Sequence, residues 1–300
     1  MKTSVAIATY NGEKYIIAQL ESILNQSKKV DEVIITDDIS SDDTVSVVND
    51  FIKENNLSDS WKIVVNEENL GYAENFRKCM DMTTGDIIFL CDQDDIWELD
   101  KVEKMYSVME DYEGIGVLVS DYVEFKNGSE IPVVHNKQSS LYEVELNCKN
   151  RFLRSLGSVM AVSQEFYQDT KKYWYKGWAQ DEYLWCVAVL FNKCVGTTYC
   201  STKRRIHENQ FSGHKFDTKE KRCQYLEREI VCAKHLLNII KTMYNKKAFN
   251  IYLKNLKTTQ RRLDLVKNRK IRNIFILPFY LRYYYSPKSF FPEIKIALKG

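Results

Sequence analysis

The chain has 300 residues, of which 44% are hydrophobic, and this is enough for one large domain or two small ones with a buried core. Its net charge of +2 hides a division, because residues 1–213 carry 22 Lys/Arg and 35 Asp/Glu whereas residues 214–300 carry 21 Lys/Arg and 6 Asp/Glu. The acidic first part argues against a nucleic-acid binder. The eight cysteines include no C-x-x-C pair, which argues against a zinc ribbon or a thioredoxin-type site.

Strand-like and helix-like segments alternate through the first 120 residues. Short runs rich in β-branched and apolar residues predict strands at 4–9, 32–36, 62–65, 86–91 and 116–121. Apolar residues at helical spacing predict helices between them, at 13–26, 42–56, 71–82 and 98–111. Strands that are apolar throughout indicate a mostly parallel, Rossmann-like α/β sheet with helices on both faces. In such sheets ligands bind at the carboxyl ends of the strands.

The pattern is less regular in the rest of the chain. Residues 122–150 are polar and predict loops. The elements expected after them are a strand at 158–163, a helix starting near Asp181, a strand at 196–200 and a loop at 203–213. After about residue 217 the chain is predicted to be helical and is densely basic.

Three carboxylates stand together in the run Asp92-Gln93-Asp94-Asp95, directly after the most apolar predicted strand. Close carboxylates repel one another, so the run is costly unless a cation lies among them. Their oxygen atoms suit Mg²⁺ or Mn²⁺, which also bind diphosphate oxygens. The alternative is a solvated turn in which Asp95 caps the next helix, but the position at the end of a strand favours a metal site.

Two further groups have chemistry that suits a nucleotide. The pair Asp37-Asp38 ends the second predicted strand, where a carboxylate can accept hydrogen bonds from a pyrimidine N–H or from ribose hydroxyls. The alternative for this segment is that Ser41 or Asp42 caps the following helix. Arg205 and His207 lie in a predicted loop, where a guanidinium suits diphosphate oxygens and a neutral imidazole can ligate a metal. Their alternative is an ordinary surface loop.

Asp181 opens a predicted helix just after an aromatic cluster that includes Trp174 and Trp178. It is either a helix N-cap or a catalytic carboxylate, and the indole faces either carry a sugar ring or belong to the core. A dinucleotide-binding G-x-G-x-x-G is absent after the first strand, where TYNGEK stands, and the chain has no P-loop motif. A nucleotide site in this chain would therefore work through carboxylates and a metal.

Four blocks in this order, VAIATYNGEKYI, VIITDDISSDDT, NLGYAENF and TGDIIFLCDQDDIW, resemble glycosyltransferase family 2, whose members have the GT-A fold. The resemblance covers about residues 3–215. The form DQDDIW and the later run RRIHENQFSG are most similar to rhamnosyltransferase-type members. The resemblance implies a metal-dependent, inverting transferase, with dTDP-rhamnose favoured as donor and a UDP-hexose second. The rivals are a non-catalytic sugar-binding or scaffolding member of the fold and a metal-dependent hydrolase.

The resemblance also implies roles for single residues. Those expected to bind the donor are Thr9, Tyr10, Asn11, Glu13, Asp38, Asp92 and Arg205. Those expected at Mn²⁺ or Mg²⁺ are Asp94 and His207, with Asp92 and Asp95 as further candidates. Asp181 matches the catalytic base, with Glu182 as the alternative. The residues expected on the acceptor side are Trp97, Trp174 and Trp178.

We expect a GT-A domain at 1–215, with a donor half at about 1–121 and an acceptor half at about 122–215, and a basic helical region at 216–300. The chain lacks the ~20-residue apolar run of a spanning helix and a signal-peptide core, so it is expected to be cytoplasmic. The apolar run 274–281 is flanked by cations, which is typical of an interfacial segment on an anionic membrane. Packing of this run on the enzyme's own core is the alternative. We therefore expect a peripheral enzyme at the inner membrane face with a glycan or lipid-linked acceptor.

Overall fold

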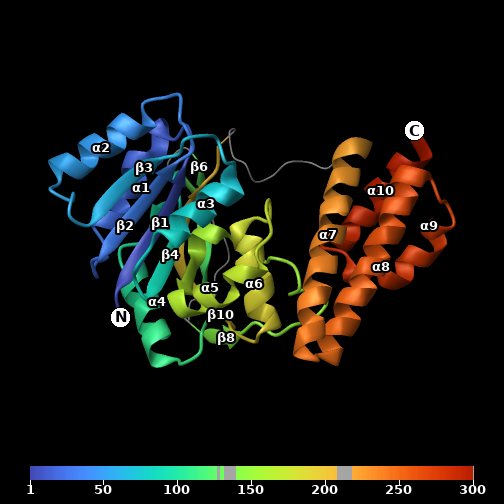
Figure 1. Ribbon diagram of the computed structural model, residues 1–300. Helices are drawn as coiled ribbons and strands as arrows, with labels where there is room; N and C mark the ends of the chain where they lie inside the picture. The colour runs from blue at the N-terminus through green and yellow to red at the C-terminus, as the bar shows by residue number, and fades with distance from the viewer. Residues whose placement is uncertain (127–128, 132–139, 208–217, 300) are drawn as a thin grey trace. The chain divides into compact units, whose positions relative to one another are not determined.

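The computed structural model describes residues 1–126, 129–131, 140–207 and 218–299 (Figure 1). The chain divides into two compact units. The first comprises Met1–Glu145 and Leu153–Glu208, and the second comprises Leu146–Phe152 and Asn209–Gly300. The break near residue 208 lies close to the boundary expected at 215. The grouping of 146–152 with the C-terminal helices was not indicated by the sequence.

The first unit contains a mixed sheet of ten strands within the described residues. The strands are β1 (Thr3–Thr9), β2 (Glu32–Asp37), β3 (Trp61–Val65), β4 (Ile87–Asp92), β5 (Ile96–Trp97), β6 (Val117–Lys126), β7 (Ser129–Ile131), β8 (Leu141–Glu143), β9 (Met160–Ser163) and β10 (Cys194–Arg205). Their order is β3-β2-β1-β4-β9-β6-β10-β5, with β7 beside β6 and β8 beside β10. The pairs among β3, β2, β1 and β4 are parallel, and so is the pair of β6 with β10. Strand β9 runs antiparallel to both β4 and β6.

Helices cover both faces of this sheet. They are α1 (Glu13–Leu24), α2 (Thr44–Glu54), α3 (Tyr72–Asp81), α4 (Lys101–Asp111), α5 (Gln164–Thr170) and α6 (Gln180–Leu190). Because side chains alternate along a strand, Val5 and Phe89 face one core with buried residues of α1, α2 and α4. On the opposite face, α3 packs on β1 and β2, and the Cys79 thiol donates to the backbone oxygen of Ile34 at 3.1 Å. The predicted α/β fold is confirmed.

The polar stretches predicted to be loops contain strands. Residues 122–126 continue β6, and β7 and β8 also fall within 122–150, whereas 203–205 continue β10. Strands β6 and β10 remain paired as far as Phe125 and Arg205, so the backbone hydrogen bonds of the sheet continue into these polar stretches. Their side chains there are mostly polar, which is why the sequence pattern did not indicate strands. Residues 208–213 of the predicted loop lie outside the described part of the chain.

The second unit is helical and basic, as expected. Its main helices are α7 (Lys219–Met243), α8 (Lys246–Asn268), α9 (Asn273–Ile276) and α10 (Phe290–Lys299), with the 3₁₀ helix η3 (Leu277–Tyr283) between α9 and α10. Helices α7 and α8 pack together, and a buried ion pair of 2.7 Å joins Arg262 on α8 to Glu293 on α10. Among the described residues, no helix has both the length and the apolar character needed to cross a membrane.

Candidate active site

The turn from β1 into α1 is attached to the turn after β4 by Gln93. The Gln93 Oε1 atom accepts from the Tyr10 backbone N–H at 2.9 Å, and its amide group donates to the Tyr10 carbonyl at 3.0 Å. A Cβ atom at Gly12 would lie 2.3 Å from this Oε1 atom, so a glycine allows the close approach. Asn11 accepts from the Ser41 N–H at 2.8 Å. Tyr10 and Asn11, predicted on the donor side, are both exposed at this edge of the sheet.

Thr9 and Glu13, the other predicted donor-side residues of this turn, contact the segment after β2. The Thr9 hydroxyl donates to Asp37 Oδ2 at 2.7 Å, and both residues are buried. The Glu13 N–H donates to Asp42 Oδ2 at 3.1 Å, and the exposed Glu13 carboxylate accepts from the Asp43 N–H at 3.4 Å. Thr9 therefore holds β1 to β2, whereas Glu13 lies at the surface.

Asp38 is buried, with 3% of its surface exposed, and its carboxylate holds the loop between β3 and α3. Its Oδ1 atom accepts from the Asn66 amide at 2.8 Å and from the Leu70 N–H at 2.7 Å, and Oδ2 accepts from the Gly71 N–H at 2.8 Å. These three hydrogen bonds do not exhaust the acceptor capacity of a carboxylate, which has about four lone-pair sites. The structure therefore shows Asp38 ordering this loop, and its expected contact with the pyrimidine ring stays a prediction.

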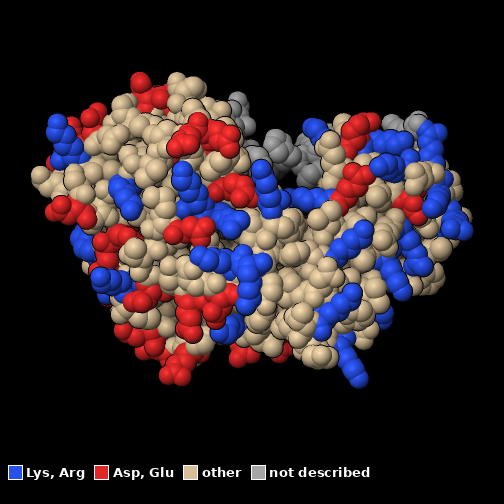
Figure 2. Space-filling view, viewed as in Figure 1, with Lys and Arg blue, Asp and Glu red and all other residues tan. Residues whose placement is uncertain are grey.

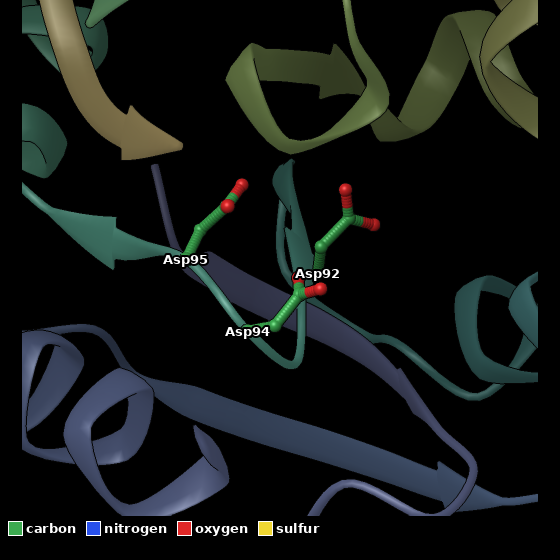
Figure 3. A group of neighbouring side chains, drawn as sticks. All are labelled: Asp92, Asp94 and Asp95. Carbon is green, nitrogen blue, oxygen red and sulfur yellow. The ribbon is translucent and has the colours of Figure 1, made fainter. Parts of the chain in front are cut away.

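The three predicted metal carboxylates come together at the end of β4 (Figure 3). Asp92 is the last residue of β4, and Asp94 and Asp95 follow in the turn to β5, with ligand oxygens all within 4.8 Å of one another. Burial and the charges of Asp95 and Asp94 raise the pKa of Asp92 well above its usual value. Burial and the Asp94 charge raise the pKa of Asp95 to about 6. Oxygen donors that repel one another at this separation suit a divalent cation, whose charge would remove the repulsion.

The end of β10 joins this acidic cluster from more than 100 residues away. The Arg205 backbone N–H donates to Asp95 Oδ1 at 3.0 Å, and its Nε atom donates to the Asp94 carbonyl at 2.9 Å. The Nε2 atom of His207 lies 2.7 Å from Asp94 Oδ2. The other ring nitrogen, Nδ1, is buried and has no hydrogen-bond partner within the described residues. The structure thus brings Arg205 and His207 to the predicted metal carboxylates.

Lys101, at the start of α4, is a buried cation near the cluster that the sequence did not reveal. Its Nζ atom donates to the Ser158 carbonyl at 2.6 Å and to the Thr202 hydroxyl at 3.0 Å, and lies 4.0 Å from the centroid of the Trp97 ring. Burial lowers the pKa of Lys101 to about 7, against the opposing attraction of nearby acidic groups that include Asp95. In the sequence this lysine belongs to a polar helix start, which predicts an exposed side chain.

Helix α3 holds the segment that leads into α6. The Gln180 amide donates to the Tyr72 hydroxyl at 2.7 Å, and Glu74 Oε1 accepts from the Gly177 N–H at 3.0 Å. Tyr72 and Glu74 both lie in the first turn of α3, directly after the loop that the Asp38 carboxylate orders. This helix therefore connects the β2–β3 side of the sheet to the residue immediately before Asp181.

Asp181, the predicted base, lies close enough to the acidic cluster to interact with it. Its carboxylate is among the charges that raise the pKa of Asp92, and after burial the charges of Asp92 and Asp181 are the largest causes of the raised pKa of Tyr72. Asp181 Oδ1 accepts from the Glu182 N–H at 2.7 Å, so part of its hydrogen-bonding capacity is used at the start of α6. Asp181 and the alternative Glu182 are both partly exposed.

The three tryptophans expected on the acceptor side are buried. Trp174 and Trp178 pack edge-on against Tyr183, with ring centroids 5.0 and 5.5 Å apart, and the Trp97 ring lies 6.0 Å from that of Phe89. A stacked sugar needs an open ring face, and these faces are covered by protein. The structure supports the interpretation of Trp174 and Trp178 as core, which the sequence left open, and it buries Trp97 as well.

A comparison with known protein families identifies the family of this chain. Residues 4–185, more than half of the chain, match the model of "Glycosyl transferase family 2". The chain belongs to glycosyl transferase family 2. The resemblance drawn from the four sequence blocks is confirmed, and the matched region contains the acidic turn after β4 and Asp181.

Relatives of the chain are glycosyltransferases by name. It is 32% identical over 138 residues to the "Putative glycosyltransferase EpsE" of Bacillus subtilis, a match that covers 44% of this chain and 49% of EpsE, so the chain spans about half the length of that relative. It is 26% identical over 256 residues to "UDP-Glc:alpha-D-GlcNAc-diphosphoundecaprenol beta-1,3-glucosyltransferase WfgD" of Escherichia coli, covering 82% of this chain and 95% of WfgD. It is 36% identical over 101 residues to the "dTDP-rhamnosyl transferase RfbG" of Shigella flexneri, covering 32% and 34%.

Solved structures agree on the fold. The crystal structure of S. aureus TarS 1–349 superposes with a TM-score of 0.65 at 17% identity, covering 99% of this chain and 90% of TarS 1–349. The same protein in complex with UDP-GlcNAc gives a TM-score of 0.61 over 98% and 91%. At this level of identity the likeness establishes the GT-A fold alone.

Proposed function

We propose that this chain moves a sugar from a pyrimidine nucleoside diphosphate to a hydroxyl group of a growing cell-surface glycan, with inversion at the anomeric carbon. The observation that carries the proposal is the convergence of His207 and Arg205 on the carboxylates of Asp92, Asp94 and Asp95. Clustered oxygen ligands beside a guanidinium group suit a cation-bound diphosphate. The position of this cluster at the carboxyl end of β4 is where α/β sheets bind nucleotides.

The donor set fits Mn²⁺ or Mg²⁺. Asp94 and His207 would hold the ion, with Asp92 and Asp95 beside it, because carboxylates suit both ions and an imidazole is accepted by the softer Mn²⁺. A bound ion would supply positive charge against the leaving diphosphate. The Arg205 guanidinium, whose Nε atom is already oriented by the Asp94 carbonyl, would bind the diphosphate oxygens from the side of β10.

Asp181 would act as the general base. As the acceptor oxygen attacks the anomeric carbon and the bond to the diphosphate breaks, the carboxylate accepts the proton of the acceptor hydroxyl. One displacement with one base inverts the configuration, whereas a glycoside hydrolase needs a pair of carboxylates. Glu182 is the alternative base.

The donor is proposed to be a UDP-hexose or dTDP-rhamnose. The DQDDIW form and the partial match to the protein named RfbG favour the rhamnose donor. The UDP-glucose in WfgD's name favours a UDP-hexose, and WfgD matches over more of the chain than RfbG does. The diphosphoundecaprenol in WfgD's name supports a lipid-linked acceptor, which would place the reaction at a membrane surface.

A thermal-unfolding panel of nucleotide sugars with Mn²⁺ tests the proposal. A ligand at ~100 times its dissociation constant adds about 2.7 kcal/mol of stability, which moves the midpoint by several degrees. Asp94→Asn should abolish the stabilisation by Mn²⁺ and nucleotide, whereas the matched control Asp50→Asn, an exposed acid on α2, should keep it. Stabilisation by neither UDP-sugars nor dTDP-sugars would refute the proposal, and stabilisation without sugar transfer to any glycan acceptor would favour a sugar-binding role.

A further inference from the structure

The second unit exposes four large apolar side chains on α9, η3 and α10. Phe275 on α9 and Phe279 on η3 are 74% and 83% exposed, and Phe291 and Leu298 on α10 are 71% and 64% exposed. Phe291 and Leu298 are seven residues apart on α10, so they lie along one side of that helix. We call these four residues, together with the exposed cations Arg272, Lys288 and Lys295, the aromatic–basic surface.

These side chains point outward because a core of their own occupies the inner side of the same segments. Leu277, Tyr284, Phe290 and Ala297 are buried in one cluster with Leu265 of α8. The segments therefore already have the packing that orders them, and among the outer phenylalanines Phe291 adds a ring contact of 5.9 Å with Phe290. Large apolar side chains exposed in this number over a short stretch indicate a surface that is covered in use.

The charge of this stretch has one sign at the surface. Residues 269–298 contain six Lys/Arg and a single acidic residue, Glu293. Glu293 is fully buried, where it pairs with Arg262 at 2.7 Å, whereas cations such as Arg272, Lys288 and Lys295 are exposed. Figure 2 shows Lys and Arg side chains dense over the C-terminal helices. The outward charge of residues 269–298 is thus positive.

We propose that the aromatic–basic surface docks on an anionic phospholipid bilayer. Phenylalanines enter the boundary between headgroups and acyl chains, while lysines and arginines bind lipid phosphates. The proposal rests on the proposed function in one respect, since a lipid-linked acceptor lies in such a bilayer, and it adds which surface of the chain approaches the lipid.

Charge also decides against a second copy of the chain as the occupant. A two-fold contact would place the same cationic surface against itself, and like charges brought together oppose association. An acidic partner whose surface is polar would satisfy the cations, but it would leave the phenylalanines without an apolar environment. An anionic bilayer supplies both.

Co-sedimentation of the full chain with vesicles tests the proposal. Vesicles of phosphatidylcholine mixed with phosphatidylglycerol should bind the protein, and vesicles of phosphatidylcholine alone should bind it at least tenfold less. The double variant Phe275→Ser, Phe279→Ser should lose about tenfold in binding, because both side chains leave water on docking. The control Tyr244→Ser, at a residue 92% exposed at the end of α7, should bind like the wild type.

The contribution of charge is measured in the same assay. Arg272→Gln with Lys288→Gln should weaken binding about tenfold, whereas Lys241→Gln with Lys247→Gln, exposed in the same unit but outside the surface, should weaken it less. Raising the salt from about 0.1 M to about 1 M shortens the screening length from ~10 Å to ~3 Å and should release most of the protein.

Three results would overturn the proposal: equal binding to neutral and anionic vesicles, wild-type binding by the double phenylalanine variant, or no vesicle binding at all. Concentration-dependent dimerisation that the phenylalanine variant loses, without vesicle binding, would assign the surface to a second copy. Binding of UDP with Mn²⁺, measured in vesicle-free buffer, should be the same in every surface variant. A failure of nucleotide binding would therefore refute the proposed function and leave the vesicle result standing.

Discussion

Replacing Asp181 by asparagine separates its proposed role as the base from its position in the helix. The asparagine side-chain carbonyl can still accept from the Glu182 N–H, which Asp181 Oδ1 now accepts at 2.7 Å, so the stability of α6 should change by less than about 0.5 kcal/mol. Sugar transfer should fall by ~10²–10⁴-fold, the usual contribution of a general base. That loss corresponds to about 3–5 kcal/mol of transition-state stabilisation.

The structure adds a second expectation, which concerns the donor. The charge of Asp181 is one of the causes that raise the pKa of Asp92, so its removal eases the repulsion within the acidic cluster. A cation in the cluster loses some attraction at the same time, so binding of UDP with Mn²⁺ should stay about the same in Asp181→Asn. A variant that had damaged the cluster would instead bind the nucleotide more weakly.

The assay compares initial transfer rates at saturating donor with the dissociation constant of UDP and Mn²⁺ from titration calorimetry. Glu182→Gln is the matched control, since it removes the neighbouring carboxylate of the same helical turn. Near-normal transfer by Asp181→Asn together with a loss in Glu182→Gln would move the base by one residue. Normal transfer by both variants would refute the assignment of a base to this segment.

Three further predictions follow from contacts around the site. Tyr72→Phe leaves the Gln180 amide without its acceptor, so unfolding free energy should fall by about 1–3 kcal/mol, and transfer should fall with UDP binding unchanged; an unaltered urea midpoint would contradict this. Gly12→Ala and Gln93→Ala each remove the hydrogen bonds between Gln93 and the Tyr10 backbone, so the double variant should be as stable as the less stable of the two single variants. Additive losses of stability would argue against a shared contact. The pKa of Asp95 is raised from 3.8 to about 6, so between these two pH values Asp95 is protonated in the metal-free fold and ionised in the unfolded chain. The contribution of this group to stability is therefore lost as the pH rises through this range. The rise in melting temperature caused by Mn²⁺ should therefore be larger at about pH 7 than at about pH 5, and an equal rise at both would count against the metal site.

The parts of the site that the sequence predicts are those fixed by local pattern. Asp92, Asp94 and Asp95 are adjacent in the chain and follow a strand that is apolar throughout, so their meeting at a sheet edge needed no knowledge of distant contacts. The contact of His207 with Asp94 could be expected only from the family resemblance, because it depends on how β10 lies beside β5.

The features that the sequence did not predict have a common physical cause, which is burial decided by tertiary packing. An indole such as Trp178 has the same sequence signature whether its face is open or lies against Tyr183. Lys101 is a helix-start lysine whose side chain turns inward to Ser158 and Thr202, a contact over 57 and 101 residues. Asp38 has the residue type and strand-end position of a ligand-binding carboxylate, and no sequence pattern identifies the backbone N–H groups of Leu70 and Gly71 that donate to its oxygens.

The hydrogen bonds of the Asp38 carboxylate also determine at which step the loop between β3 and α3 loses its conformational entropy. Leu70 and Gly71 donate to a buried acceptor that belongs to the same domain, and Gly71 has a left-handed φ of 80° directly before α3. The loop is therefore fixed when the domain folds, and a ligand that binds against it does not have to order it. Substitutions in this loop should then act on the free energy of unfolding, and their effect on ligand affinity should be indirect.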